Sequence, residues 1–262
     1  MSTFFSAKKA NHLNAARRSN SQLMAQPPCS TIALIGPDGS GKSTVAAALM
    51  TQSVLPLKYL YMGTSIESSN HALFTSRLAH RWKVYQHKKS LRKQGISVPQ
   101  QITLHGSEHR VDKRGKLGGG LRLFRRISEE IYRQLISWSY QCRGKIVLYD
   151  RHFLFDACPP PDDFSQRRLS AHRLTDRIHF WFLKNLYPRP DIAILLDAPP
   201  QTLFARKQEI PLENLESDRI QLKKRKDYSR NFFIVDCTKS INEVVAEINQ
   251  ILDKHCAKKI IA

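Results

Sequence analysis

A glycine-rich stretch near the start of the chain carries the residue types best suited to binding phosphate. Residues 36–43 read Gly-Pro-Asp-Gly-Ser-Gly-Lys-Ser and match the pattern GxxxxGK[ST] between an apolar run and an alanine-rich stretch. Glycines allow successive backbone N–H groups to surround phosphate oxygens at the positive end of a helix. Lys42 would add a cation for the terminal phosphates, and the Ser43 hydroxyl a ligand for Mg²⁺. A turn that only connects a strand to a helix is the alternative.

Further candidates stand where buried strands are predicted to end. Asp150 and Arg151 follow the apolar residues 145–149, and Asp197 follows residues 192–196. The carboxyl ends of parallel strands face the ligand crevice of an open α/β sheet. Asp150 is therefore predicted to hold Mg²⁺ through water and Arg151 to bind a phosphate group of a ligand, with a structural ion pair as the alternative. Asp197 precedes Pro199 and is predicted equally well as a helix N-cap.

The elements that must position these residues alternate from residue 31 onward, as in a parallel α/β sheet. We expect strands at 31–35, 57–62, 145–149, 192–196 and 232–235, and helices at 43–52, 121–140, 174–187, 199–207 and from 241. Apolar residues recur every three or four positions in 121–140, which predicts a helix whose apolar side faces the core. Phe180, Trp181 and Phe182 are likewise expected to pack inside, and Ser240 with Glu243 forms a capping box.

Charge is unevenly distributed along the 262 residues. The formal net charge is +20, and residues 71–126 contain 14 basic and 2 acidic residues. We expect an insertion at about 71–120, with a short helix over 73–91, that is either a solvated basic loop or an element facing a substrate or a membrane. Residues 1–28 contain no acid and are predicted to be a basic disordered tail, with an organellar transit peptide as the alternative. Residues 29–262 are then a single domain.

Cysteine, histidine and hydropathy patterns exclude other classes. The five cysteines are scattered without a CxxC pair, and the ten histidines show no metal-ligand spacing. Apolar runs are far shorter than the roughly 18 residues of a membrane span. The sequence predicts a cytoplasmic protein, and organellar targeting by residues 1–28 stays open.

Residues 36–44, Gly-Pro-Asp-Gly-Ser-Gly-Lys-Ser-Thr, resemble the phosphate loop of the thymidylate kinase family, which also carries a carboxylate at the place of Asp38. The pair Asp150-Arg151 resembles the Asp-Arg signature of that family. Residues 190–200 followed by Arg206 are similar to its fourth strand and the start of its lid. Residues 232–236 followed by Glu243 are similar to its closing strand and helix. The likeness covers most of residues 31–255 in order.

The resemblance implies a three-layer P-loop kinase fold, with a five-stranded parallel sheet flanked by helices, and MgATP as the phosphoryl donor. It implies a lid at about 206–230, an Asp38 that contacts the acceptor sugar, and an Arg151 that contacts acceptor phosphate. Gly39 and Ser40 stand where part of the family has an arginine, so Arg206 or Arg219 of the lid would neutralise the transferred phosphoryl group. The residues expected to act in catalysis are then Lys42, Asp150, Arg151 and Arg206. The expected metal ligands are Ser43 and Asp150. The residues expected to bind the nucleotide are those of the loop, Gly36, Asp38, Gly39, Ser40, Gly41, Lys42, Ser43 and Thr44.

Two differences from the family concern the acceptor. After the second strand the chain has Tyr61-Met62-Gly63-Thr64 in place of an Arg-Glu-Pro-Gly-Gly stretch, and the family's arginine in the helix before the Asp-Arg strand is matched only approximately by Arg125 and Arg126. The predicted function is transfer of the γ-phosphoryl group of ATP to a nucleoside monophosphate or related small acceptor. The alternative is an ATP-binding module whose basic segment docks on nucleic acid or an anionic membrane. A nucleic-acid partner is not expected, and a homodimer stays open.

Overall fold

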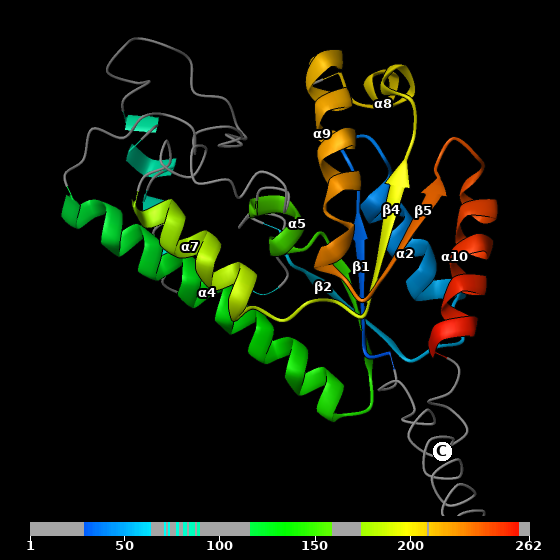
Figure 1. Cartoon of the computed structure of the whole chain (residues 1–262), viewed down its shortest axis with the longest axis horizontal. Helices are drawn as coiled ribbons and strands as arrows, with labels where there is room; N and C mark the ends of the chain where they lie inside the picture. The colour runs from blue at the N-terminus through cyan, green and yellow to red at the C-terminus, as the bar shows by residue number, and fades with distance from the viewer. Residues whose placement is uncertain are drawn as a thin grey trace, which may run out of the picture.

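The computed structural model describes residues 29–63, 116–158, 174–208 and 210–256, together with single residues between 71 and 89. The expected basic tail and most of the expected insertion lie outside the described residues. Five strands form one sheet in the order β2-β3-β1-β4-β5, and every neighbouring pair is parallel (Figure 1). The strands are β1 (Thr31–Ile35), β2 (Leu57–Tyr61), β3 (Ile146–Asp150), β4 (Ile192–Asp197) and β5 (Asn231–Asp236). The predicted five-stranded parallel α/β fold is confirmed.

Helices cover both faces of this sheet, so the three central strands β1, β3 and β4 are buried on both sides. Ile32 and Leu34 of β1 pack with α2 (Lys42–Gln52) and α10 (Ile241–Cys256), whereas Ala33 and Ile35 pack against the opposite layer. That layer contains α4 (Lys116–Cys142), α5 (Phe153–Ala157) and α7 (Leu174–Asn185). The helices α8 (Pro200–Arg206) and α9 (Leu212–Lys224) follow the carboxyl end of β4, and the 3-10 turn η3 (Lys226–Tyr228) leads into β5. The Ser240–Glu243 capping box is present, with the Ser240 N–H donating to the Glu243 carboxylate at 2.9 Å.

The long helix α4 turns a polar side toward the sheet, which contradicts the sequence-based expectation. Leu121, Phe124 and Trp138 are 72%, 70% and 46% exposed, so these three predicted core positions do not face the core. The buried positions are instead polar: Glu129, Glu130, Arg133, Gln134 and Ser137.

Polar groups on the sheet explain this orientation of α4. The buried Arg133 guanidinium donates to the backbone oxygen of Gly63 at 2.7 Å and pairs with Glu129 at 2.9 Å. Ser137 Oγ lies 2.6 Å from the Tyr149 hydroxyl. Buried polar groups must be paired, and these pairs need a polar helix face.

The helix α7 differs from expectation in the same way. Trp181 is 58% exposed, so its assignment to the core was wrong, while Phe180 and Phe182 are half-buried. No helix within the described part of the chain is long and apolar enough to cross a membrane.

Candidate active site

The glycine-rich loop joins β1 to α2, where the motif requires it. Gly39 and Gly41 have φ angles of 84° and 82°, a backbone conformation that favours glycine. Gly41 is the N-cap of α2, and no side chain caps that end of the helix. A Cβ atom on Gly39 would lie 2.6 Å from the backbone oxygen of Leu203 in α8. The loop therefore lies directly against the helix that begins the predicted lid.

Lys42 lies inside the loop. Its Nζ donates to the backbone oxygens of Gly36 and Pro37, at 2.8 Å each, and the residue is 7% exposed. Burial lowers the pKa of Lys42 to about 8. Phosphate oxygens that enter the loop would compete with these carbonyl groups for the same ammonium group.

Ser43 and Asp150 come together at the carboxyl edge of the sheet. Asp150 Oδ2 accepts hydrogen bonds from Ser43 Oγ at 2.8 Å and from the Tyr59 hydroxyl at 3.0 Å. A hydroxyl and a carboxylate are the oxygen ligands that Mg²⁺ prefers, and Mg²⁺ commonly completes its shell with water and substrate phosphates. The described residues hold no group of three or more His, Cys, Asp or Glu side chains suited to a metal. The Ser43–Asp150 pair thus fits a magnesium ion that arrives with a nucleotide.

Asp38 forms a second cluster of charges beside the loop. Its carboxylate accepts from an Arg151 NH2 group and from Lys207 Nζ, the latter at 3.4 Å, and lies 4.0 Å from Lys42 Nζ. Burial alone would raise the pKa of Asp38, but the positive charges of Arg151 and Lys42 outweigh it and hold the pKa at about 2. Asp38 is therefore an anion at any physiological pH.

Arg151 has an unusual backbone conformation. Its φ of 68° is in the left-handed region, and among the described residues it is the one non-glycine residue with positive φ. Its N–H donates to the Leu34 oxygen at 3.0 Å, which fixes the turn after β3. A Cβ atom on Gly63 would lie 2.7 Å from Arg151 Cδ, so the glycine leaves room for this side chain. Strained residues of this kind concentrate at functional sites.

The two candidate lid arginines have different partners. Arg206, the last residue of α8, donates to the backbone oxygen of Cys237 at 2.9 Å. Arg219 of α9 donates to both oxygens of Asp197, at 2.7 and 3.1 Å. The N-cap of α8 is Pro199, without a side-chain bond, so the N-cap interpretation of Asp197 is wrong. Asp197 instead anchors α9, because Lys223 also pairs with it at 2.8 Å.

The structure thus gathers Asp38, Lys42, Ser43, Asp150 and Arg151 at one edge of the sheet. Arg206 bonds outside this group, to the residue that follows β5. Sequence reasoning missed Tyr59 and Lys207, whose partners are distant in the chain. It also compared Arg125 and Arg126 with the family's helix arginine, whereas the buried arginine of α4 is Arg133. The recurrence of polar residues at 129, 130, 133, 134 and 137 was the available signal, because that spacing marks one side of a helix.

Comparisons with known proteins match part of the chain. No protein-family model matches the chain. A curated thymidylate kinase from Thermosipho africanus (strain TCF52B) is 40% identical over 79 residues, which are 27% of this chain and 38% of that relative. The chain therefore matches well under half the length of this relative. Over that stretch the match confirms the resemblance to thymidylate kinases drawn from the sequence.

Solved structures of deoxyadenosine kinase from M. mycoides are also similar. The form with the products dCMP and a flexible dCDP bound shares 18% identity with a TM-score of 0.47, covering 86% of this chain and 99% of that chain. The form with bound dCTP shares 19% identity with a TM-score of 0.44, covering 86% and 99%. TM-scores below 0.5 do not support an inference about function. The fold is assigned from the order and direction of the strands.

Proposed function

We propose that the chain is a nucleotide kinase that transfers the γ-phosphoryl group of MgATP to the phosphate group of a nucleoside monophosphate. The observation that carries the proposal is the meeting of Lys42, Ser43 and Asp150 with the Asp38–Arg151 pair at one edge of the sheet. The partial match to a thymidylate kinase supports it.

The donor half of the site consists of the loop and its metal ligands. The backbone N–H groups of Gly36 and of residues 38–44 would surround the ATP phosphates, and Lys42 would neutralise the terminal ones. Ser43 and Asp150 would hold Mg²⁺, which supplies charge neutralisation at the phosphates when bound. Tyr59 donates to Asp150 and so fixes the orientation of this carboxylate.

The acceptor half favours a phosphate over a hydroxyl group. A hydroxyl acceptor needs a general base whose pKa is near the working pH; of the two carboxylates considered for this role, Asp38 and Asp150, Asp38 is unsuited because Arg151 and Lys42 hold its pKa at about 2. A phosphate acceptor is already anionic and needs cations, which Arg151 and Lys207 provide beside Asp38. Transfer then depends on positioning and charge neutralisation, with Arg206 or Arg219 of the lid as the cation on the transferred group.

A coupled assay of ADP release tests the proposal. Purified protein with MgATP is offered nucleoside monophosphates, the matching nucleosides and phosphorylated sugars, with Lys42→Ala as the control. We expect turnover with at least one nucleoside monophosphate and none with its nucleoside. Turnover with nucleosides alone would overturn the acceptor assignment, and ATP binding without ADP release on any acceptor would favour a binding module.

A further inference from the structure

A buried histidine, His152, follows Arg151 directly and is 1% exposed. Its ring lies among three aromatic rings, with centroids 5.4 Å from Tyr149, 6.2 Å from Phe155 and 5.7 Å from Tyr187. Burial lowers the pKa of His152 to about 3, so the ring is neutral at any physiological pH. An enclosed, neutral imidazole neither brings charge to a ligand nor exchanges protons with one, and the proposed phosphoryl transfer gives it no role.

His152 provides the hydrogen bonds with which α5 begins. It is the N-cap of this five-residue helix, and its Nδ1 accepts from the Leu154 N–H at 3.3 Å. Its backbone oxygen accepts from the N–H groups of Phe155 and Asp156, at 2.9 and 3.0 Å. Because Nδ1 accepts, the proton of the neutral ring is on Nε2. A helix this short is not stable by itself, so α5 depends on His152 for its position.

The same residue holds one side of the strained turn at Arg151. On the strand side, the Arg151 N–H donates to the Leu34 oxygen at 3.0 Å. On the helix side, the extended backbone of His152 connects the turn to the cap of α5. A residue with a φ of 68° keeps that conformation only where its surroundings impose it. Leu154 is fully buried, so loss of the Nδ1 acceptor would leave its N–H unpaired and favour a rearrangement of the turn.

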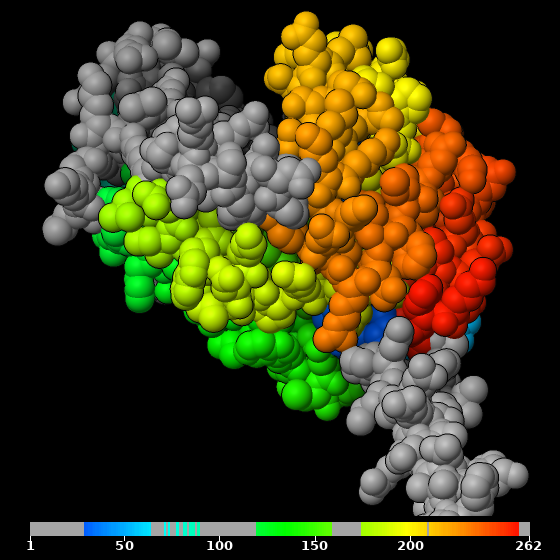
Figure 2. Space-filling view, viewed as in Figure 1, coloured from blue at the N-terminus to red at the C-terminus, as the bar shows by residue number. Residues whose placement is uncertain are grey.

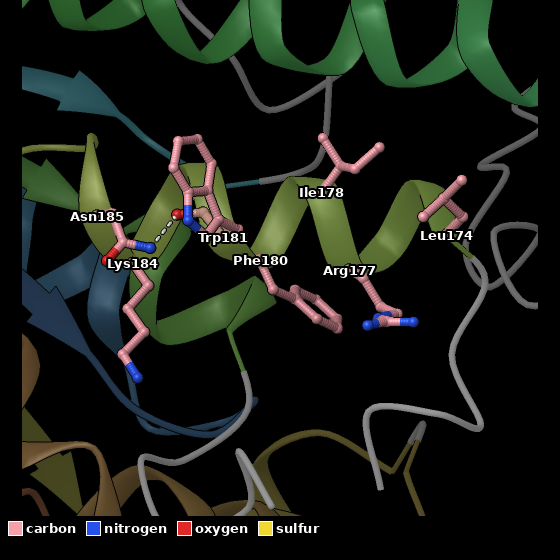
Figure 3. A pocket seen from close by; sticks show the side chains of 7 residues that line it. All are labelled: Leu174, Arg177, Ile178, Phe180, Trp181, Lys184 and Asn185. Atoms are coloured by element: carbon pink, nitrogen blue, oxygen red, sulfur yellow. Dashed lines mark hydrogen bonds between the residues drawn. The ribbon is translucent and has the colours of Figure 1, made fainter. Parts of the chain in front are cut away.

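The end of α7 covers the His152 ring. Tyr187 stands two residues after that helix, and α7 forms part of the outer surface on the face shown in Figure 2. A cavity of about 560 Å³ also lies along α7, and its described lining residues all belong to that helix (Figure 3). They include neither Arg151 nor His152, so a His152 variant that changes ligand binding would not act through this cavity.

We propose that His152 is a positioning residue for the phosphoryl acceptor: as the cap of α5, its Nδ1 keeps Arg151 in the left-handed turn that directs the guanidinium to Asp38 and to an acceptor phosphate beside it. The proposal rests on the assignment of Arg151 to the acceptor under the proposed function. The part of the side chain that positions Arg151 is the hydrogen-bond acceptor at Nδ1, whereas the ring contributes packing.

Two substitutions separate the cap from the ring. His152→Asn keeps an atom that accepts from the first N–H groups of a helix, as asparagine does at N-caps, but removes the ring. His152→Phe keeps an aromatic ring and removes the acceptor atom. Tyr187→Leu is the matched packing control, because it removes a ring that packs on His152 and leaves the cap in place. The melting temperature of each variant measures its stability.

Steady-state kinetics with a nucleoside monophosphate give the first test. We expect His152→Phe to raise the KM for the acceptor at least tenfold, with the KM for ATP within about twofold. His152→Asn and Tyr187→Leu should keep the acceptor KM within about threefold, although both lower the melting temperature. In an Arg151→Ala background, His152→Phe should have no further effect, because it acts through that arginine. An acceptor KM that rises in step with lost stability across the three variants, or an additive effect of the two substitutions, would overturn the proposal.

NMR spectra of the arginine Nε–H groups test the positioning without turnover. The signal that Arg151→Ala removes identifies Arg151, and its chemical shift depends on the contact of the guanidinium with Asp38. We expect this signal to be unchanged in His152→Asn and shifted or broadened in His152→Phe. An unchanged signal in His152→Phe, or an equal change in both variants, would overturn the positioning role. Absence of turnover with every nucleoside monophosphate would instead contradict the proposed function, and the spectra would still decide the role of His152.

Discussion

Lys42 is buried and carries the charge that the proposed ATP binding would use. The backbone oxygens of Gly36 and Pro37 hold its ammonium group in the loop. We therefore expect Lys42→Ala to abolish ATP turnover without unfolding the chain, as measured by the ADP-release assay and circular dichroism. Turnover near the wild-type rate would remove the phosphate-loop assignment.

The lowered pKa of Lys42 also predicts a pH dependence. The free protein loses the Lys42 proton above a pH of about 8, whereas bound phosphate favours the charged form. The dissociation constant for ATP should therefore rise above pH 8, by up to about tenfold per pH unit, and stay flat below it. Lys42→Arg, which keeps its charge, should flatten the profile. Calorimetric titration across pH 6.5 to 9.5 measures both proteins, and identical profiles would contradict the assignment.

Arg151 should act on the acceptor and not on the donor. Its guanidinium lies on Asp38, beside the loop, and its strained backbone fixes its direction. We expect Arg151→Ala to raise the KM for the acceptor at least tenfold and to change the KM for ATP little. Gly63→Ala, which crowds the Arg151 side chain, should shift the same constant in the same direction but less. A selective rise in the KM for ATP would mean that the two sites are exchanged.

At the scale of elements, the proposed lid would supply the cation that the loop lacks. An arginine in this role contributes on the order of 10³ to 10⁵ in kcat. We expect Arg206→Ala to lower kcat strongly with little effect on ATP binding, and a lysine at the same position to restore part of it, because a point charge lacks the bidentate geometry of a guanidinium. Arg206 must then exchange its bond to Cys237 for one to the nucleotide. Arg219→Ala is the companion variant, and if it alone lowers kcat, α9 supplies the cation.

The buried Arg133 predicts a stability effect within α4. Replacing it with methionine leaves Glu129 without its charged partner and the Gly63 oxygen without the Arg133 donor, at a cost of about 3 to 5 kcal/mol in the free energy of unfolding. Arg143→Met, at an exposed position just after the same helix, should change it by less than about 0.5 kcal/mol. Urea unfolding measures both variants. Equal effects would mean that the buried pair does not stabilise α4.

Features that depend on neighbouring residues in the sequence could be predicted. Features that depend on contacts between residues far apart in the chain could not. The strand before Gly36 and the strand before Asp150 are local apolar runs, and the loop is a local pattern. The face of α4 depends on the oxygen of Gly63 and the hydroxyl of Tyr149, and the role of Asp197 depends on Arg219. Apolar spacing located α4 correctly but could not show that its partners on the sheet are polar.

For the whole molecule, we expect nucleotide binding to raise the melting temperature. The loop contacts α8 as well as joining β1 to α2, so a ligand in the loop stabilises the folded state as a unit. A ligand at 100 times its dissociation constant contributes about 2.7 kcal/mol, which corresponds to roughly 5 to 10 °C in Tm for a chain of this size. We expect such a rise with Mg²⁺ and a non-hydrolysable ATP analogue, and none for Lys42→Ala. An equal rise in both proteins would place the nucleotide elsewhere.

The reversed polarity of α4 makes this helix a locally frustrated part of the energy landscape. If α4 were rotated about its axis, it could bury Phe124, Leu135 and Trp138 against the sheet. The hydrophobic effect alone would favour that arrangement. The native orientation is selected by a few directional bonds from Arg133 and Ser137, which the competing arrangement cannot form. Loss of those bonds would therefore do more than weaken the native state. It would lower the energy gap to a compact competing state in which α4 is rotated about its axis and Phe124, Leu135 and Trp138 are buried.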